Sequence, residues 1–215
     1  MRNRHIATRT SLQTKIWKNV MLTWEELAER LATTTKTAET QGEYGNTPKG
    51  EQDRIKDVGG FVGGKLRSGR RKAGDVEYRD LLTLDADFAA PDLLDKLDVS
   101  LSCAWCVYST HKHKAEKPRL RLVIPLDRPV TAEEYEAIAR KVAEGLGMDQ
   151  FDDTTYQPHR LMYWPSTSLD GEFVFEQEGG PALSADAVLA EYRDWKDVSE
   201  WPFSSRAKQD TQRLL

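Results

Sequence analysis

Several features that direct a chain to a membrane or to secretion are missing from this sequence of 215 residues. No apolar run approaches the roughly 18 residues that a membrane-spanning helix needs, and the N-terminal stretch MRNRHIATRT has no apolar segment of the signal-peptide kind. Only two cysteines are present, which fits a reducing compartment better than a disulfide-bonded secreted domain. We therefore expect a cytoplasmic protein with no membrane partner.

The sequence also lacks an excess of positive charge. It has 31 Lys and Arg against 35 Asp and Glu, so its formal net charge is −4. This balance excludes a generally basic surface, and any contact with nucleic acid has to come from local patches. Hydrophobic residues make up 39% of the chain, enough for one good core or for one core with a smaller appended layer.

No phosphate-binding P-loop accompanies the glycines. The stretch GGFVGG at residues 59–64 lacks the terminal Lys-Ser/Thr and the preceding apolar strand that such a loop needs. We interpret the glycine-rich segment 59–72 as a flexible hinge. Its basic side chains are Lys65, Arg67, Arg70, Arg71 and Lys72.

Capping signals and hydrophobic periodicity predict the order of the elements. Thr23 and Glu26 have the spacing of a capping box, which predicts a helix through Ala32. By the same criteria, helices are expected at 51–58, 91–97, 131–146 and 184–195, and strands at 79–87, 100–110, 118–126, 159–165 and 171–177. Residues 196–215 are expected to form a frayed tail or a linker.

From residue 79 onward the expected order is strand, helix, strand, strand, helix, strand. This is the split βαβ or ferredoxin-like order, which RNA-recognition (RRM) domains also use. The predicted fold class is therefore α/β (α+β), with an RRM-like β-sheet unit at residues 80–200. An N-terminal α/β segment is expected at 1–79, and a tail or linker at 201–215.

Two carboxylates close the first strand of this unit, in the stretch LLTLDADF (81–88). Side chains alternate along a strand, so Asp85 and Asp87 point the same way. Two carboxylates at such a short distance repel each other unless a cation lies between them or one of them takes up a proton. The alternative to a functional carboxylate pair is a solvated strand end that runs into a turn at Pro91.

A second cluster combines hydroxyl, imidazole and basic groups within YSTHKHKAEKPRLRLVIPL (108–126), and it comprises Ser109, His111, His113, Lys117, Arg119 and Arg121. Alternation would place the hydroxyl and both imidazoles on one face of a strand. In the split βαβ order the third strand lies between the first and the second, which would bring Arg119 and Arg121 beside the acidic pair. Such a face suits an anion such as a triphosphate, because Arg binds phosphate in a fork and Ser donates a hydrogen bond. The alternative is a solvated basic hairpin.

A third group of carboxylates, Asp149, Asp152 and Asp153, precedes the strand expected at 159–165. Alone, such a loop is typical of a turn or a helix cap. In the predicted fold it ends beside the first strand, where a third carboxylate would complete a set of oxygen ligands for Mg²⁺ or Mn²⁺. Two such ions, about 4 Å apart, hold the attacking and leaving oxygens in phosphoryl transfer.

Cys103 and Cys106 have the spacing of a zinc-binding pair, and histidines follow them. A zinc pair needs a turn between its cysteines, whereas this segment has the pattern of an apolar strand. We therefore expect two buried thiols and no zinc.

Taken together and in order, these motifs resemble those of the archaeo-eukaryotic primase superfamily: an acidic pair, a Ser-x-His and a late acidic residue. More closely, IKDVGGFVGG, LLTLDADF, YSTHKHKAEKPRLRLVIPL and FDDTTYQPHRLMYWPS resemble the N-terminal region of the virulence-associated protein E family. Members of that family are replication proteins of phages and mobile elements. The resemblance runs from about residue 15 to about residue 203.

The resemblance implies a primase-polymerase catalytic core that copies a single-stranded DNA template with nucleoside triphosphates and Mg²⁺ or Mn²⁺. It implies that Asp85, Asp87 and Asp152 bind metal, with Asp153 as the fallback for the third position, and that Ser109 and His111 hold the nucleotide's phosphates. Charge and predicted position add further phosphate contacts at Lys117, Arg119, Arg121 and Arg160. The implied site lies in a cleft between an N-terminal α/β unit and the RRM-like unit.

One departure from the family concerns a partner. Family members usually carry a helicase-type ATPase domain after this region, and no P-loop is present here. The resemblance therefore implies a helicase domain elsewhere or a separate helicase. Because the net charge is acidic, we expect weak template binding unless such a partner or the basic residues 65–72 assist.

Two other functions stay open from the sequence. His111 and His113 resemble the His-x-His metal motif of rolling-circle nicking endonucleases, with Tyr135 or Tyr156 as nucleophile, although the middle residue is usually hydrophobic and here is Lys112. The second alternative is a non-catalytic nucleic-acid-binding module. That function favours exposed aromatics on the central strands of the sheet, and PRLRLVI has none.

Overall fold

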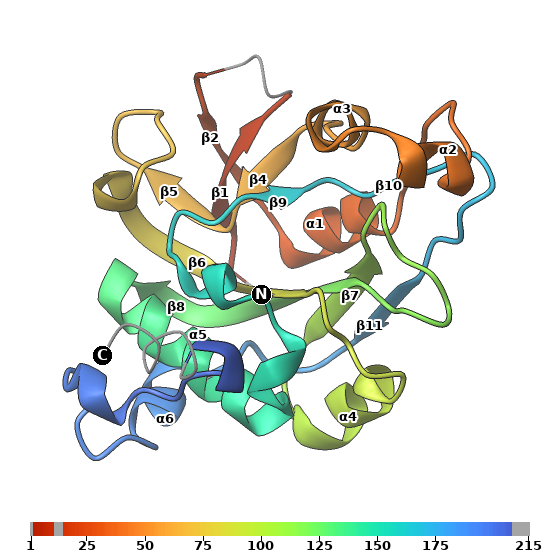
Figure 1. The fold of residues 1–215 in the computed structure, drawn as a ribbon. Coiled ribbons are helices and arrows are strands. Elements are labelled where there is room, and N and C mark those ends of the chain that lie inside the picture. Colours follow the sequence, from red (N-terminus) through yellow and green to blue (C-terminus); the bar gives the residue numbers. More distant parts are fainter. Residues whose placement is uncertain (1, 11–14, 208–215) are drawn as a thin grey trace, which may run out of the picture.

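Three β-sheets form the framework of residues 2–10 and 15–207, the part of the chain that the computed structural model describes (Figure 1). The largest has the order β11-β7-β8-β6-β5 and contains β5 (Gly64–Leu66), β6 (Val76–Ala86), β7 (Trp105–Ser109), β8 (Leu120–Val130) and β11 (Phe175–Glu178). The second has the order β2-β1-β4-β9 and contains β1 (Arg4–Arg9), β2 (Lys18–Leu22), β4 (Gly60–Val62) and β9 (Met162–Tyr163). The third is a parallel pair of β3 (Thr35–Lys36) and β10 (Ser166–Thr167).

Helices cover the large sheet on one side and accompany the N-terminal sheet on the other (Figure 1). They are α1 (Trp24–Leu31), α2 (Gln41–Asn46), α3 (Lys49–Ile55), α4 (Leu93–Ser100), α5 (Ala132–Leu146) and α6 (Ala185–Leu189). Short 3₁₀ turns add Ala73–Asp75, Met148–Gln150, Asp153–Tyr156 and Val198–Glu200. Within the described ranges, no helix combines the length and the apolarity that crossing a membrane requires.

The two central strands of the large sheet are buried on both faces. Leu82 and Leu84 of β6 pack in one core with α4, α5 and α6, whereas Leu81 packs in a second core with α1 and β1. A strand that is covered on both sides has an apolar run instead of an alternating pattern. This explains why LLTL is continuous, and it means that neither face of β6 is open to solvent along this stretch.

The predicted mixed α/β fold is confirmed, and the split βαβ order holds for its first three strands, whereas the prediction of the fourth strand at 159–165 in this sheet is wrong. β8 lies between β6 and β7 and runs antiparallel to both. In this register Asp85 pairs with Arg121, so the acidic strand end and the arginine strand are neighbours, as the order predicts.

The strands at the edges of the large sheet are not those of a complete split βαβ unit. β9 joins the N-terminal sheet, β11 pairs with β7 at the far edge, and β5 occupies the edge beside β6. Strand β6 itself runs across the boundary that we expect at residues 79/80. The division into 1–79, 80–200 and 201–215 stays a prediction.

The prediction of a flexible hinge at 59–72 is wrong for its glycine-rich half. Residues 60–66 form β4 and β5, in which only Lys65 is not fully buried. A Cβ atom on Gly60 would lie 2.5 Å from the carbonyl oxygen of Met162, and one on Gly64 would lie 2.2 Å from that of Tyr78. These glycines therefore allow neighbouring strands to approach closely, which is a packing role.

The expected frayed tail is also wrong as far as the described residues reach. Trp201 donates an indole hydrogen bond to the carbonyl of Trp195, and Arg140 of α5 binds the carbonyl of Pro202. Arg206 donates to the carbonyl of Phe151, at 2.6 Å. Residues 201–207 thus pack against α5 and the loop that precedes Asp152, while the rest of the tail lies outside the described residues.

Replacing Thr131 by Ala is expected to lower the free energy of unfolding by about 1 kcal/mol. Its hydroxyl accepts a hydrogen bond from the backbone N–H of Glu134, at 3.2 Å, and Glu134 binds the backbone N–H of Thr131 in return. Without the hydroxyl, the first turn of α5 loses one partner. Thermal melting of Thr131→Ala should fall by about 2–4 °C. Thr131→Ser keeps the cap and should melt near the wild type; equal melting of the Ala variant would contradict the prediction.

Candidate functional site

Three carboxylates meet where β6 ends. Asp85, Asp87 and Asp152 each place an oxygen within 4.8 Å of the others, in a group that could hold a metal ion. The loop before Asp152 is fixed to the strand because the backbone N–H of Asp152 donates to the carbonyl of Asp85, at 2.9 Å. The hydroxyl of Thr155 accepts the backbone N–H of Asp85, at 2.8 Å. Two segments distant in sequence thus hold the triad together.

Asp153, the fallback for the third position, lies outside this group. Its carboxylate is 3.7 Å from the guanidinium of Arg206 instead. Asp152 caps the 3₁₀ turn that follows, since its Oδ1 accepts from the backbone N–H of Thr154, and its Oδ2 accepts from Arg160 at 3.0 Å.

Asp85 is the most buried member of the triad, with only 3% of its surface exposed. Burial raises the pKa of its carboxyl group, and the nearby guanidinium of Arg121 lowers it in part. Its Oδ1 is 3.3 Å from Nε of Arg121 but accepts no hydrogen bond among the described residues. A buried carboxylate oxygen without a donor is costly unless a cation binds it. The triad therefore fits a hard divalent cation such as Mg²⁺ or Mn²⁺.

A cleft of about 390 Å³ opens over the triad. Seven basic side chains line it together with the three carboxylates, and they are Lys49, Lys56, Arg71, Lys112, Arg119, Arg121 and Arg160. Arg119 donates to Asp87 at 2.8 Å. In a chain of net charge −4, seven cationic side chains against three carboxylates give the cleft a local positive excess, which favours an anionic ligand.

Four of the six phosphate ligands expected from the sequence reach this cleft: His111, Arg119, Arg121 and Arg160. Lys117 lies instead in a neighbouring pocket, which shares His111, Lys112 and Arg119 with the cleft.

Ser109 does not line the cleft. It is fully buried, and its hydroxyl accepts the backbone N–H of Val174 at 2.9 Å. β7 ends at Ser109, and His111 lies in the turn that follows. The expectation that Ser109, His111 and His113 share one strand face is therefore wrong, because alternation applies only where the strand continues. Their roles in phosphate binding stay predictions.

Several cleft residues were not found from the sequence. Lys49 and Lys56 belong to the region of α3, and no pattern in that helix signals a site. Arg71 belongs to the basic run 65–72, which was the only signal for it. Lys112 stands out in the sequence only as the middle residue of the stretch His111-Lys112-His113.

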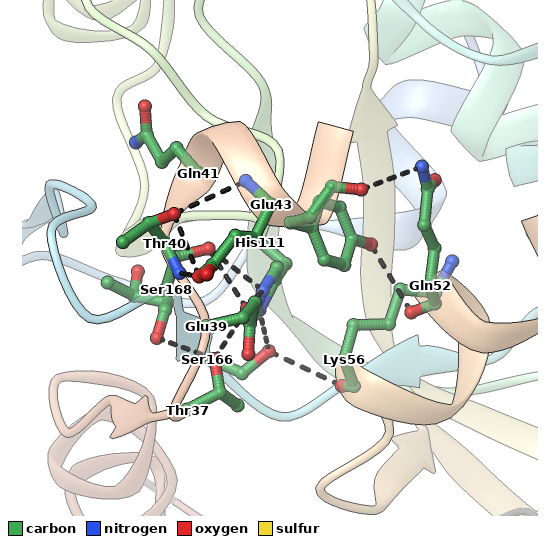
Figure 2. A network of polar contacts seen from close by, with 12 residues as sticks. Thr37, Glu39, Thr40, Gln41, Glu43, Gln52, Lys56, His111, Ser166 and Ser168 are labelled. Atoms are coloured by element: carbon green, nitrogen blue, oxygen red, sulfur yellow. Dashed lines mark hydrogen bonds and ion pairs between the residues drawn. The ribbon is translucent and has the colours of Figure 1, made fainter. Parts of the chain in front are cut away.

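The imidazole of His111 is the centre of a polar network from four segments of the chain (Figure 2). Nδ1 lies 2.9 Å from Oγ of Ser166, and Nε2 lies 2.8 Å from Oε1 of Glu39. Oγ of Ser168 is 3.3 Å from Nε2, and the ring of Tyr44 lies in a tilted arrangement beside the imidazole, with the ring centroids 4.4 Å apart. Burial lowers the pKa of His111, while the bond to Glu39 raises it in part. The ring is thus held in place and neutral near pH 7.

The remaining candidates from the sequence are enclosed by protein. Tyr135 and Tyr156 are 0% and 1% exposed, and the hydroxyl of Tyr135 donates to the carbonyl of Thr83. His113 accepts the backbone N–H of Arg119 and lines only the neighbouring pocket. Cys103 and Cys106 are free and buried thiols, as expected.

Comparison with known proteins places these features in context. The family model described as the VapE N-terminal domain matches residues 2–204. No curated protein matches the sequence. Among solved structures, the chain is similar to the AEP domain (PP-N190) of the primase-polymerase (PrimPol) of cyanophage S-2L, with a TM-score of 0.47, 11% sequence identity and 87% of each chain covered.

Proposed function

Because this chain belongs to the family of VapE N-terminal domains, we propose that it is a primase-polymerase domain: a nucleotidyltransferase that makes primers on a DNA template for a phage or mobile element. The observation that carries the proposal is the triad Asp85, Asp87 and Asp152 at the base of a cleft lined by basic side chains. Clustered carboxylates for divalent ions, beside cations for a triphosphate, are the arrangement that phosphoryl transfer requires.

The carboxylates of the triad would hold Mg²⁺ or Mn²⁺. When bound, the ions supply charge neutralisation for the triphosphate and for the attacking and leaving oxygens. Asp85 is oriented for this by Arg121 and Arg160, whose guanidinium groups lie 3.3 and 3.8 Å from its two oxygens. Asp152 is oriented by Arg160 and by its cap on Thr154.

The basic side chains of the cleft would bind the triphosphate. In the reaction, the 3′-hydroxyl of the primer or initiating nucleotide loses its proton and attacks the α-phosphorus, and the bond to pyrophosphate breaks. Negative charge develops on the leaving pyrophosphate. Arg119, Lys56 and Lys112 line the cleft and would stabilise this charge. Translocation along DNA would come from a helicase domain or a separate helicase.

Two other functions receive less support. A nicking endonuclease needs a tyrosine that DNA reaches, and both Tyr135 and Tyr156 are enclosed. A binding module of the RRM type needs an open sheet face, and both faces of β6 and β8 pack in cores.

Incorporation of a labelled nucleotide is expected to require both a DNA template and a divalent ion. Chelation should abolish it, and Mn²⁺ or Mg²⁺ should restore it, because the triad then regains its charge balance. The ion should also raise the melting temperature of the nucleotide-free protein, since the triad is assembled only in the folded chain. Template-independent or chelator-insensitive incorporation would contradict the proposal, as would no incorporation with either ion.

A further inference from the structure

The cleft contains an imidazole whose two nitrogens face different surroundings (Figure 2). Ser166, the partner of Nδ1, lines the cleft, whereas Glu39, the partner of Nε2, does not. Glu39 comes from the segment between β3 and α2. The His111 side chain is 2% exposed and that of Glu39 is 15% exposed, so this pair is shielded from solvent.

Glu39 is held as a carboxylate. Burial raises its pKa, but hydrogen bonds from Thr37, from its own backbone, from His111 and from Ser168 outweigh burial and lower the pKa overall. Three donors converge on Oε1: the hydroxyls of Thr37 and Ser168, at 2.8 and 3.1 Å, and Nε2 of His111. A carboxylate only accepts hydrogen bonds, so the bond between Glu39 and His111 requires the imidazole proton on Nε2.

This proton placement leaves the neutral ring without a donor toward the cleft. Nδ1 then has only its lone pair, and a phosphate oxygen is also an acceptor. His111 therefore binds a phosphate only after Nδ1 gains a proton. A phosphate oxygen would then replace Oγ of Ser166 as the partner of Nδ1, and the Ser166 hydroxyl still donates to the carbonyl of Lys56, at 3.3 Å. Glu39 then faces the positive ring as its counter-charge.

We propose that Glu39 is a positioning residue that keeps the Nε2 proton of His111 in place, so that a nucleoside triphosphate binds together with one proton taken up at Nδ1. The inference rests on the proposed function, because it names the triphosphate as the ligand of this cleft. Glu39 touches neither the cleft nor the substrate. It acts through the ring.

The charges around His111 determine the pH dependence. Glu39 favours the protonated ring. Lys56, which follows α3, and Lys112, which is in the same turn as His111, disfavour the protonated ring. Lys56 is itself paired with Asp53, at 2.7 Å. Tyr44 of α2 adds no charge near neutral pH, since tyrosine ionises well above pH 7 and burial raises the pKa of Tyr44 further, to about 12. The free ring is neutral at pH 7, and a bound polyphosphate raises its pKa. The affinity for the nucleotide should therefore rise as the pH falls from the pKa of His111 in the complex to its pKa in the free protein. The rise is at most tenfold per pH unit.

Isothermal titration calorimetry tests the inference. A nucleoside triphosphate with a non-cleavable α,β-methylene bridge is titrated into the protein in buffers of different ionisation enthalpy. The wild type should take up close to one proton per nucleotide between pH 6.5 and 7.5, whereas Glu39→Gln should take up close to none and bind roughly tenfold more weakly. Glu43→Gln is the matched control, because Glu43 caps α2 at Thr40 and does not bind His111.

Nitrogen-15 NMR of the histidine rings provides a readout that does not depend on activity. The chain has four histidines, and a His111→Gln variant identifies the signal of His111. The free wild type should show Nε2 protonated, Glu39→Gln should lose this single tautomer, and Glu39→Asp should restore it in part. Proton uptake retained in Glu39→Gln, or absent from a wild type that binds the nucleotide, overturns the inference. Proton-linked binding without template-dependent incorporation would overturn only the proposed function.

Discussion

Asp85→Asn is expected to lower template-dependent incorporation by roughly 10³-fold or more, because several kcal/mol of charge stabilisation depend on the metal site. Asp85 is the buried member of the triad, and its Oδ1 has no donor among the described residues. The amide removes one negative charge and turns an N–H₂ group toward the cation. It also leaves Arg121 and Arg160 facing a neutral group, so the cleft becomes more positive where metal ions should bind.

Incorporation and Mn²⁺-induced stabilisation should be lost together in Asp85→Asn. The matched control is Asp80→Asn, a carboxylate of the same strand that is 1% exposed and pairs with Arg2, at 2.7 Å, outside the cleft. Asp80→Asn should melt earlier, since a buried pair is broken, but it should keep incorporation at temperatures where it is folded. Full incorporation by Asp85→Asn would remove the metal assignment. Equal losses in both variants would show that the effect is on folding.

The arrangement of Asp85 beside Arg121 was predictable from the sequence, and the physical reason is local. Apolar runs identified β6 and β8, the capping box at Thr131 identified α5, and the order of elements placed the third strand between the first and the second. Each of these signals depends on residues close in sequence. The relation of Asp152 to the pair also followed from the order, but choosing it over Asp153 required the backbone bond to Asp85.

The rest of the cleft depends on contacts that local patterns do not encode. Glu39 and Ser166 meet His111 from 72 and 55 residues away, and neither belongs to an apolar or acidic pattern. The position of Ser109 was wrong in detail because period-two alternation assumes that a strand continues, and β7 stops at that residue. Where a short strand ends is decided by tertiary packing, here by the bonds between Ser109 and Val174.

The glycine-rich segment shows a different limit. Glycine composition indicates conformational freedom, which predicts flexibility in residues 59–72. The same lack of a side chain allows two backbones to approach closely, and only the paired strand reveals this. At Gly64 the paired strand is β6, whose other end carries Asp85.

Gly64→Ala is accordingly expected to destabilise the fold by about 3 kcal/mol or more. The new Cβ would lie 2.2 Å from the carbonyl oxygen of Tyr78 and 2.8 Å from Cα of Arg79. Both atoms belong to the backbone of β6, so relief requires the two strands to separate. The melting temperature should fall by about 6–12 °C. Incorporation should fall with it, because a shift of β6 also displaces the end of the strand that carries the triad.

Gly145→Ala is the control for glycine replacement itself. Gly145 lies in α5, and a Cβ atom there would meet no heavy atom within 4 Å. Alanine favours the helix, so this variant should be more stable by about 0.5–1 kcal/mol. If Gly64→Ala lowers the melting temperature and Gly145→Ala raises it, the result indicates close strand packing at Gly64 and excludes a hinge there. A hinge tolerates a methyl group, so unchanged melting of Gly64→Ala would mean that β5 and β6 do not pair as closely as described.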